Sequence, residues 1–151
     1  MHPPRRPDGT SAGFTLIELL IVVAILGIVA AIAIPALQFA LNRSKQRATM
    51  NDLRMIGGAV QQYYLDRSFY PNGSVTLAQL TNLLRNYTGN IPTQDRWGHD
   101  YSYATDQKSY YSVESHGQDG LDGADIDFSS RNDFNLDLIY ASGQFAHSPE
   151  P

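Results

Sequence analysis

The chain has 151 residues, a net charge of −4 and no cysteine. This length suits one modest domain together with an anchoring segment. The small acidic excess gives no whole-chain reason to expect nucleic acid as a partner. Because cysteine is missing, disulfides, thiolate metal sites, a cysteine nucleophile and a lipidated cysteine are all excluded.

An apolar run from Leu19 to Leu37 contains no charged or strongly polar side chain. A helix needs about 20 mostly apolar residues to cross a bilayer, so this run predicts a membrane-spanning helix. A buried helix of a soluble protein is disfavoured, because such helices are usually shorter and amphipathic. A cleaved secretory signal is the other interpretation, since two arginines precede the run and Ala31-Ile32-Ala33 has the form of a leader-peptidase site. The length of the run and the acid Glu18 at its edge argue against it.

The segment from Gly13 to Pro35 reads GFTLIELLIVVAILGIVAAIAIP. It resembles, nearly without a break, the N-terminal segment of the type IV pilin and pseudopilin family. The resemblance implies that a prepilin peptidase cuts between Gly13 and Phe14 at the cytoplasmic face of the membrane. Phe14 would then become the N-methylated terminus, and residues 1–13 would be a short cleaved leader peptide.

Two residues of this segment are candidates for a role in assembly. A carboxylate at the edge of hydrocarbon is costly unless it is paired or protonated, which makes Glu18 a candidate functional residue. The resemblance implies a partner for it, the amine of Phe14 on a neighbouring subunit, and a role in setting filament register. An unpaired Glu18 that reaches to water is the alternative. Pro35 is expected to kink or locally melt the helix, and in the family this region loosens on entry into the filament.

Beyond Leu41 the pattern changes from apolar to amphipathic. Apolar residues recur at helical spacing through Leu53, Ile56, Val60, Tyr63 and Tyr64. This spacing predicts that the membrane helix continues to about residue 65 and packs on a head. The expected organisation is a leader 1–13, a transmembrane or filament-core helix 14–41, its amphipathic continuation 42–65, a globular periplasmic head 66–143 and a flexible tail 144–151.

The head is expected to combine a short helix with a small antiparallel sheet. Turn residues 69–73 end the long helix, and residues 76–87 form the short helix with Thr76 as its N-cap. Strands are expected at 101–105 and 109–115, with a further short strand over 134–140. The predicted fold is therefore α+β and type IV pilin-like, with the long helix packed on the sheet.

Asp95 to Tyr101 resembles the Asp-Pro-Trp-Gly-x-x-Tyr segment of the major pseudopilin of type II secretion. The departure is Arg96, where that family usually has proline. Trp97 is expected to anchor the sheet against the long helix. This segment favours the secretion branch of the family over the pilus branch.

Residues 115–127 form a loop rich in glycine and aspartate. Calcium prefers about six to eight oxygen ligands on a loop that can curl, and glycine permits the curl. The loop resembles the Ser-x-Gly-x-Asp-Gly-x-x-Gly calcium loop of the major pseudopilins. The resemblance implies a structural Ca²⁺ bound by Asp119, Asp125, Asp127 and the backbone carbonyl of His116, with Asp137 as the alternative later ligand. A solvated acidic loop is the metal-free interpretation.

The sequence contains no helix-spaced metal motif, nucleophile elbow or phosphate-binding glycine loop, so we expect no enzyme. The resemblance implies a structural subunit of a type II secretion filament that drives protein export across the outer membrane. Its partners would be copies of itself, minor pseudopilins, the prepilin peptidase, the inner-membrane assembly platform and lipid, but not nucleic acid.

The expected location is the bacterial inner membrane, crossed once, with a cytoplasmic N-terminus, a periplasmic head and a periplasmic filament. Two alternatives remain open from the sequence. The first is a type IV pilus subunit at the cell surface, used for adhesion, motility or DNA uptake. The second is an exported calcium-binding protein with an ordinary signal peptide.

Overall fold

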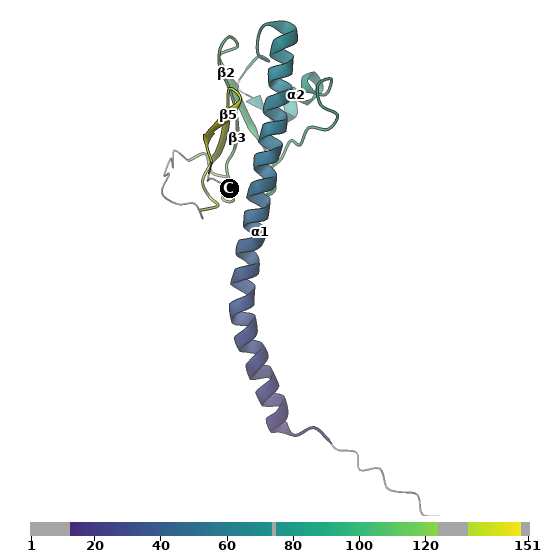
Figure 1. The fold of residues 1–151 in the computed structure, drawn as a ribbon, viewed down its shortest axis with the longest axis vertical. Coiled ribbons are helices and arrows are strands. Elements are labelled where there is room, and N and C mark those ends of the chain that lie inside the picture. The colour runs from purple at the N-terminus through teal and green to yellow at the C-terminus, as the bar shows by residue number, and fades with distance from the viewer. Residues whose placement is uncertain (1–12, 74, 124–132, 149–151) are drawn as a thin grey trace, which may run out of the picture. The chain divides into compact units, whose positions relative to one another are not determined.

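The computed structural model describes residues 13–73, 75–123 and 133–148 (Figure 1). The chain divides into two compact units, Met1–Phe39 and Ala40–Pro151, and each is considered by itself. The described elements, in chain order, are α1 (Leu16–Arg67), β1 (Val75–Thr76), α2 (Leu77–Leu84), β2 (Ser102–Thr105), β3 (Tyr111–Ser115), β4 (Leu138–Ala141) and β5 (Gln144–His147). The long helix α1 contributes residues to both units.

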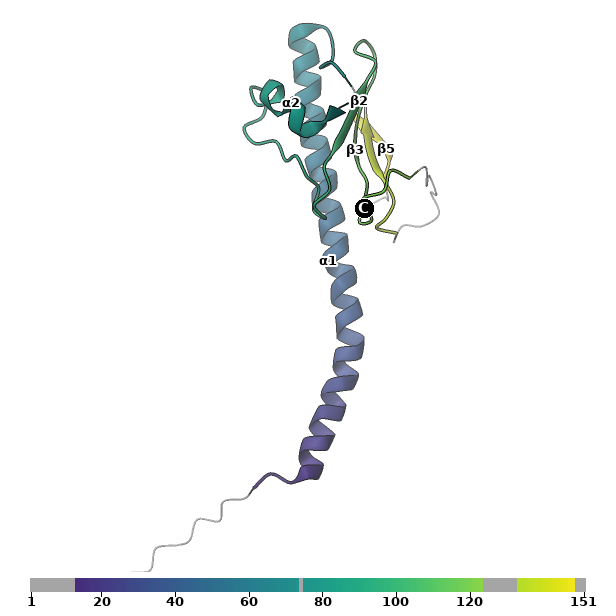
Figure 2. The same ribbon diagram turned by 180° about the vertical axis from the view of Figure 1, so that it is seen from behind.

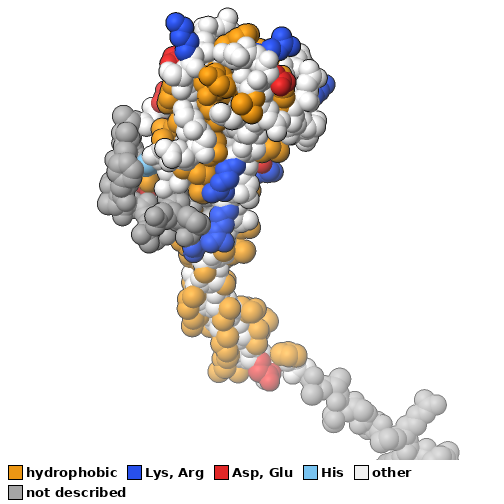
Figure 3. All heavy atoms as spheres, turned by 45° about the horizontal axis from the view of Figure 1, so that its top comes forward, with side chains coloured by type: hydrophobic (Ala, Val, Ile, Leu, Met, Phe, Trp, Pro, Cys, Tyr) orange, Lys and Arg blue, Asp and Glu red, His pale blue; other side chains and the backbone are white. Residues whose placement is uncertain are grey.

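In the first unit, the described residues are the apolar beginning of α1. Every side chain from residue 13 to 39 is exposed, including Phe14 at 85% and Ile32 at 72%. On the face seen in Figure 3, hydrophobic side chains form a nearly continuous surface along this stretch. By length and composition, α1 can cross a membrane.

The helix runs through Pro35 without a break. The expected local melting at this proline is therefore not present in the structure. Loosening of this region on entry into a filament stays a prediction.

In the second unit, the later part of α1 packs as the amphipathic pattern predicts. Leu53, Ile56, Val60 and Tyr63 are buried, and Tyr64 packs against the same core. The helix continues to Arg67, two residues beyond the expected end. It stops where Ser68 adopts a positive φ of 61°, a left-handed conformation that cannot continue a right-handed helix.

The strands form one antiparallel sheet in the order β1-β2-β3-β4-β5, so the expected α+β class is confirmed. Each strand pairs with the next along the chain; Tyr103 faces Val113 between β2 and β3, and Val113 faces Tyr140 between β3 and β4. In both ribbon views, α2 and the sheet lie on different sides of the later part of α1 (Figures 1 and 2). The core lies between these layers.

Tyrosines fill much of this core. Tyr101, Tyr103 and Tyr111 are fully buried, as expected if the tyrosine-rich strands pack on α1. Their hydroxyls find partners: Tyr111 donates to the Gly57 carbonyl at 3.2 Å and Tyr103 to the Pro71 carbonyl at 3.2 Å. Burial raises the pKa of Tyr103 to about 12, which keeps it neutral and able to donate.

The end of the chain differs from expectation. The prediction of a flexible tail from residue 144 is wrong for Gln144–His147, which form β5 and pair with β4. A two-residue turn makes this possible, since Ser142 and Gly143 both have positive φ, 48° and 94°, as a type I′ hairpin turn requires.

Two elements are shorter than the sequence indicates. The short helix spans Leu77–Leu84 rather than 76–87, and Thr76 occupies its N-cap without a side-chain capping bond. Leu83, which its spacing in the sequence places on the apolar face of this helix, is exposed. The last predicted strand begins at Leu138 rather than at residue 134. The Phe134 carbonyl instead accepts a hydrogen bond from the loop after β3, as described below.

Candidate functional site

The start of α1 holds the first group of functional candidates. Glu18 accepts two hydrogen bonds from Thr15 on one carboxylate oxygen, from the backbone N–H at 3.0 Å and from the hydroxyl at 2.9 Å. The Glu18 backbone N–H donates in return to the Thr15 hydroxyl at 3.3 Å. This is a capping box, in which the N-cap and the third helical residue satisfy each other's N–H groups.

The capping box gives Glu18 a partner within its own subunit. The carboxylate is also placed at the positive end of the helix dipole. The sequence interpretation considered a partner on a neighbouring chain or no partner at all, and it missed Thr15. The local signal was available, because Thr followed three residues later by Glu ahead of an apolar run is the capping-box pattern. Pairing of Glu18 with the Phe14 amine of another subunit stays a prediction.

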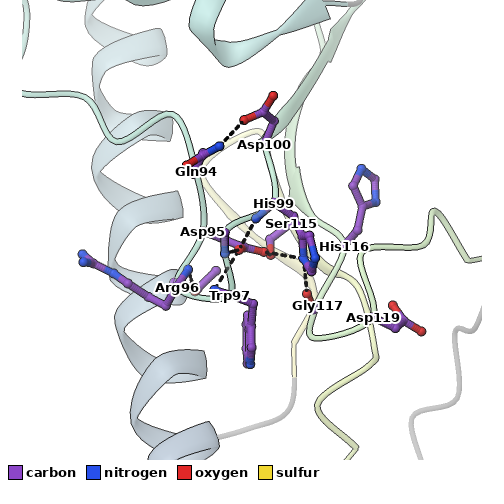
Figure 4. A network of polar contacts seen from close by, with 12 residues as sticks. Gln94, Asp95, Arg96, Trp97, His99, Asp100, Ser115, His116, Gly117 and Asp119 are labelled. Carbon is purple, nitrogen blue, oxygen red and sulfur yellow. Dashed lines mark hydrogen bonds and ion pairs between the residues drawn. The ribbon is translucent and has the colours of Figure 1, made fainter.

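The segment 95–101 forms a second site, which is built around a buried carboxylate (Figure 4). The Asp95 side chain is fully buried. Its Oδ1 accepts from the backbone N–H groups of Trp97, Gly98 and His99, each at 2.9 Å. Its Oδ2 accepts from the Ser115 hydroxyl at 2.7 Å. Asp95 thus shapes its own turn and ties that turn to the end of β3.

The same turn also contacts α1. The Trp97 indole N–H donates to Asn42 on α1 at 3.4 Å, which agrees with the expected contact between Trp97 and the long helix. Arg96 forms an ion pair with Asp52 at 2.9 Å, and its backbone N–H donates to Thr49. The Asp52 side chain is only 10% exposed. Arg96, the departure from the family's proline, therefore supplies the counter-charge for a carboxylate on the buried face of α1.

The glycine-rich loop after β3 is fixed by contacts on both sides. Gly117 has a φ of 61°, and a Cβ there would come within 2.8 Å of the backbone carbonyls of residues 134 and 135. Its own carbonyl accepts from the His99 Nδ1–H at 3.0 Å. The Gln118 N–H donates to the Phe134 carbonyl at 2.7 Å. Only glycine fits this close approach of two backbones.

Three side chains meet beside this loop: His116, Asp122 and Asp137. One nitrogen or oxygen atom from each lies within 4.8 Å of the other two. His116 Nδ1 and Asp137 Oδ1 are 3.9 Å apart. Both atoms are shielded from solvent and have no hydrogen-bond partner. The other oxygen of Asp137 accepts from the Gly123 N–H at 3.2 Å.

Burial raises the pKa of the Asp137 carboxyl above its ordinary value. The Gly123 N–H bond and the nearby His116 act in the opposite direction. Asp137 is also positioned through its backbone, because its carbonyl accepts from His147 Nδ1 at 2.6 Å. The carboxylate is therefore held in a shielded place where a positive partner would be favourable.

The expected calcium ligands are placed as follows. Asp119 is exposed, bonds to the Leu121 N–H, and is not one of the three grouped residues. The His116 carbonyl already accepts from the Gly120 N–H at 3.1 Å. Asp125 and Asp127 lie outside the described residues. Asp137, the alternative ligand, is in the group, and it meets the imidazole of His116 together with Asp122, which the sequence interpretation did not select.

Comparison with known families connects these features to a protein class. A family model described as prokaryotic N-terminal methylation motif matches residues 9–34. A second model, described as type II secretion system protein G, matches residues 37–130 and so covers more than half of the chain. The chain belongs to the type II secretion system protein G family. The resemblance inferred from the sequence is thereby confirmed.

Individual members of the protein G family are similar over most of their length. Type II secretion system core protein G of Pseudomonas aeruginosa is 34% identical over 127 residues, which are 74% of this chain and 87% of the relative. The core protein G of Klebsiella michiganensis is 30% identical over 78% of this chain and 91% of the relative. No solved structure matches the chain.

The similarity to a pilus protein covers a smaller part of the chain. The fimbrial protein EcpC of Eikenella corrodens is 46% identical, but over 46% of this chain and 47% of the relative. The protein G match reaches across the head to residue 130. The secretion interpretation is therefore better supported than the pilus alternative, and the family is one of structural subunits.

Proposed function

We propose that this member of the protein G family is the major pseudopilin of its secretion system. It would be the repeating subunit of a periplasmic filament assembled from the bacterial inner membrane. Residues 14–41 would cross the membrane once, with the N-terminus at the cytoplasmic face and the head in the periplasm. The filament would then drive folded proteins through the outer membrane.

The supporting observation is the apolar surface of residues 13–39, the described part of the first unit, which carries one acid, Glu18, near its start. A surface of this size in water would be strongly unfavourable. Lipid covers it before assembly, and the equivalent helices of neighbouring subunits cover it afterwards. Such a helix can move from lipid to filament core at little cost in apolar burial, because both environments are dry.

Processing would create the partner that Glu18 needs. Cleavage between Gly13 and Phe14 by the prepilin peptidase frees an amine, and Phe14 is then N-methylated, which keeps the positive charge. In the filament, this amine faces Glu18 of a neighbour, so the two charges neutralise each other in the apolar core and fix the axial register. Further partners are the minor pseudopilins and the inner-membrane assembly platform. Catalysis belongs to the processing enzymes, not to this chain.

The central test replaces Glu18 by Gln and compares filaments with those of the wild type. Asp66→Asn, which removes an exposed acid from the same helix, is the matched control. We expect Glu18→Gln to accumulate in the membrane as cleaved monomer, whereas Asp66→Asn gives cross-linkable polymers at the wild-type level. Normal polymers from Glu18→Gln would overturn the proposal.

Two further measurements separate the alternatives. Mass spectrometry of the mature protein should find an N-terminus at methyl-Phe14; a start at Ile34 would instead support an ordinary signal peptide. Deletion of the gene should leave secreted proteins in the periplasm. Loss of surface fibres with normal secretion would show a pilus subunit.

A further inference from the structure

Three cations follow the apolar part of α1 almost at once. Arg43, Lys45 and Arg47, which together form a basic belt, come just after Leu41, and all three side chains are exposed. A helix rises about 1.5 Å per residue, so the basic belt lies within about 9 Å of Leu41 along the helix axis. The headgroup region on each side of the hydrocarbon is about 5–8 Å thick, and long Lys and Arg side chains can reach back toward it. If α1 crosses the membrane as proposed, the basic belt lies at the level of the lipid headgroups.

No acid balances the basic belt along this part of the helix. Between Leu19 and Asn51, the sequence contains these three cations and no Asp or Glu. Asp52, the next acid, is already paired with Arg96 at 2.9 Å. Among the residues that the structure describes, none of the three cations takes part in an ion pair. The basic belt is therefore a patch of uncompensated positive charge, and it favours an anionic partner.

The head places the only tryptophan of the chain beside the basic belt. Trp97 is half-buried, and its indole N–H donates to Asn42, the residue before Arg43. The Asn42 amide donates in turn to the Gln118 side chain at 3.2 Å, so the head contacts α1 down to this residue. Tryptophan is enriched at membrane–water interfaces, where its ring lies at the headgroup level. Trp97 and the basic belt thus indicate the same interface from two separate parts of the chain.

The proposed orientation makes the position of this charge unusual. Lys and Arg are normally in excess on the cytoplasmic side of a membrane protein. Here Arg5 and Arg6 would be removed with the leader, whereas the basic belt would stay on the periplasmic side. Membrane topology therefore does not explain the belt, but attraction to anionic lipid on that side would explain it.

We infer that the basic belt binds the headgroups of anionic phospholipids of the phosphatidylglycerol kind, in the periplasmic leaflet of the membrane that α1 crosses. Arg43 and Arg47 are four residues apart and so share one face of the helix. Their guanidinium groups donate hydrogen bonds to the lipid phosphate, and Lys45 adds a point charge. The bound lipid fixes how deeply the helix is inserted before assembly. The inference rests on the proposed membrane crossing, not on filament formation.

The test uses the fluorescence of Trp97 in the full mature chain, reconstituted at low density into phosphatidylcholine vesicles. One set of vesicles contains a minor fraction of phosphatidylglycerol with brominated acyl chains, and the other contains the same fraction of brominated phosphatidylcholine. Bromine quenches tryptophan on contact, so the quenching reports which lipid lies next to Trp97. A single basic residue near an anionic surface favours it about fivefold. We expect brominated phosphatidylglycerol to quench at least about twice as strongly, and this preference to disappear in about 1 M salt.

A belt variant, Arg43→Gln/Lys45→Gln/Arg47→Gln, assigns the preference to these cations. It should be quenched equally by the two brominated lipids. Because all three positions are exposed, the Tm of the head should stay at the wild-type value, which thermal unfolding in detergent checks.

The matched control is Arg67→Gln/Arg85→Gln/Lys108→Gln, which removes the same charge from exposed positions elsewhere in the second unit. It should keep the preference for phosphatidylglycerol. Glu18→Gln, which the proposed function expects not to polymerise, should keep the preference as well. Failure of the lipid inference and failure of the proposed assembly are therefore distinguishable.

Several results would overturn the inference. Equal quenching of the wild type by both lipids, or none by either, would show that no anionic lipid is enriched beside Trp97. A preference that survives in the belt variant would place the lipid elsewhere, and a preference lost in the control variant too would reflect net charge alone. If the basic belt instead binds an acidic surface of a neighbouring subunit, the wild type will show no lipid preference and the belt variant will fail to polymerise.

Discussion

At Gly57, α1 lies close against side chains of the sheet. A Cβ there would overlap the ring of Tyr140 and lie 3.2 Å from the Tyr111 hydroxyl, whereas a Cβ at Gly58 meets nothing within 4 Å. We expect Gly57→Ala to lower the free energy of unfolding by about 1–3 kcal/mol, because the Tyr140 ring must move. Gly58→Ala gains helix propensity and should be neutral or stabilising by up to about 1 kcal/mol. Urea unfolding compares them, and equal effects would contradict the close contact.

Asp106 organises the turn between β2 and β3. One of its oxygens accepts from the backbone N–H groups of Lys108, Ser109 and Tyr110, and the other from the Ser109 hydroxyl. These bonds, those of Ser109 first, hold the pKa of the Asp106 carboxyl well below its usual range. A carboxyl with a lowered folded-state pKa stabilises the fold above its unfolded pKa of about 3.9, and this contribution is lost as pH falls through the folded value.

We therefore expect the stability difference between wild type and Asp106→Asn to be greatest above about pH 5 and to shrink as the pH falls toward 2. Thermal unfolding of both proteins across this range measures the difference. Asp66→Asn, at an exposed position on α1, controls for the general loss of a negative charge. A difference that is constant with pH would show that the charge of Asp106 contributes nothing to the turn.

At the scale of elements, Arg96 connects the 95–101 turn to α1. Its partner Asp52 is nearly buried, and the Tyr101 hydroxyl at 3.4 Å is the other donor described there. Arg96→Ala would leave this carboxylate poorly paired. Because the Arg96 side chain is half exposed, we expect a loss of about 1–2 kcal/mol, less than for a fully buried pair. The double variant with Asp52→Asn should recover part of that loss. Simple additivity of the two variants in urea unfolding would show that the pair is not coupled.

Elements defined by local periodicity were predictable from the sequence. The spacing of Leu53, Ile56 and Val60 predicts the buried face of α1. The alternating tyrosines predict strands β2 and β3. The strand β5 was not predictable in this way. It depends on pairing with β4 through the turn at Ser142 and Gly143, where a serine adopts a positive φ. The prolines that follow it suggested a loose end instead.

The same contrast between local patterns and long-range contacts applies to the candidate sites. The Thr15–Glu18 capping box is local and readable from the sequence. The meeting of His116 with Asp137 joins residues 21 positions apart, and it depends on how the loop backbone packs against residues 134 and 135. Sequence spacing can identify such acids as candidates. It cannot show that a neighbouring imidazole, rather than a backbone carbonyl, turns toward them.

At the scale of the whole molecule, the two units have different sources of stability. The second unit has its own core of buried side chains from α1, α2 and the sheet. The described residues of the first unit bury none of their side chains. Under the proposed function, lipid or other subunits would cover that surface. Changes in the head should therefore act on folding, whereas changes near the start of α1 should act on assembly with the head intact.

Thr15 allows this separation to be tested. Its two hydrogen bonds hold the Glu18 carboxylate in one orientation before any neighbour arrives. Without the hydroxyl, the Glu18 side chain must be ordered during assembly, at about 0.5–1.5 kcal/mol for a side chain of this kind. We expect Thr15→Ala to raise the critical concentration for polymerisation of the mature chain by roughly 2–10-fold, without changing the Tm of the head.

Thr15→Ser, which keeps the hydroxyl, is the matched control and should polymerise nearly as well as the wild type. Sedimentation of filaments over a series of protein concentrations measures both variants. If the serine variant were as defective as the alanine variant, the threonine methyl group, not the cap, would be what the filament requires. If neither variant had an effect, Glu18 would be oriented by the neighbouring subunit alone, and the capping box would serve only to begin the helix.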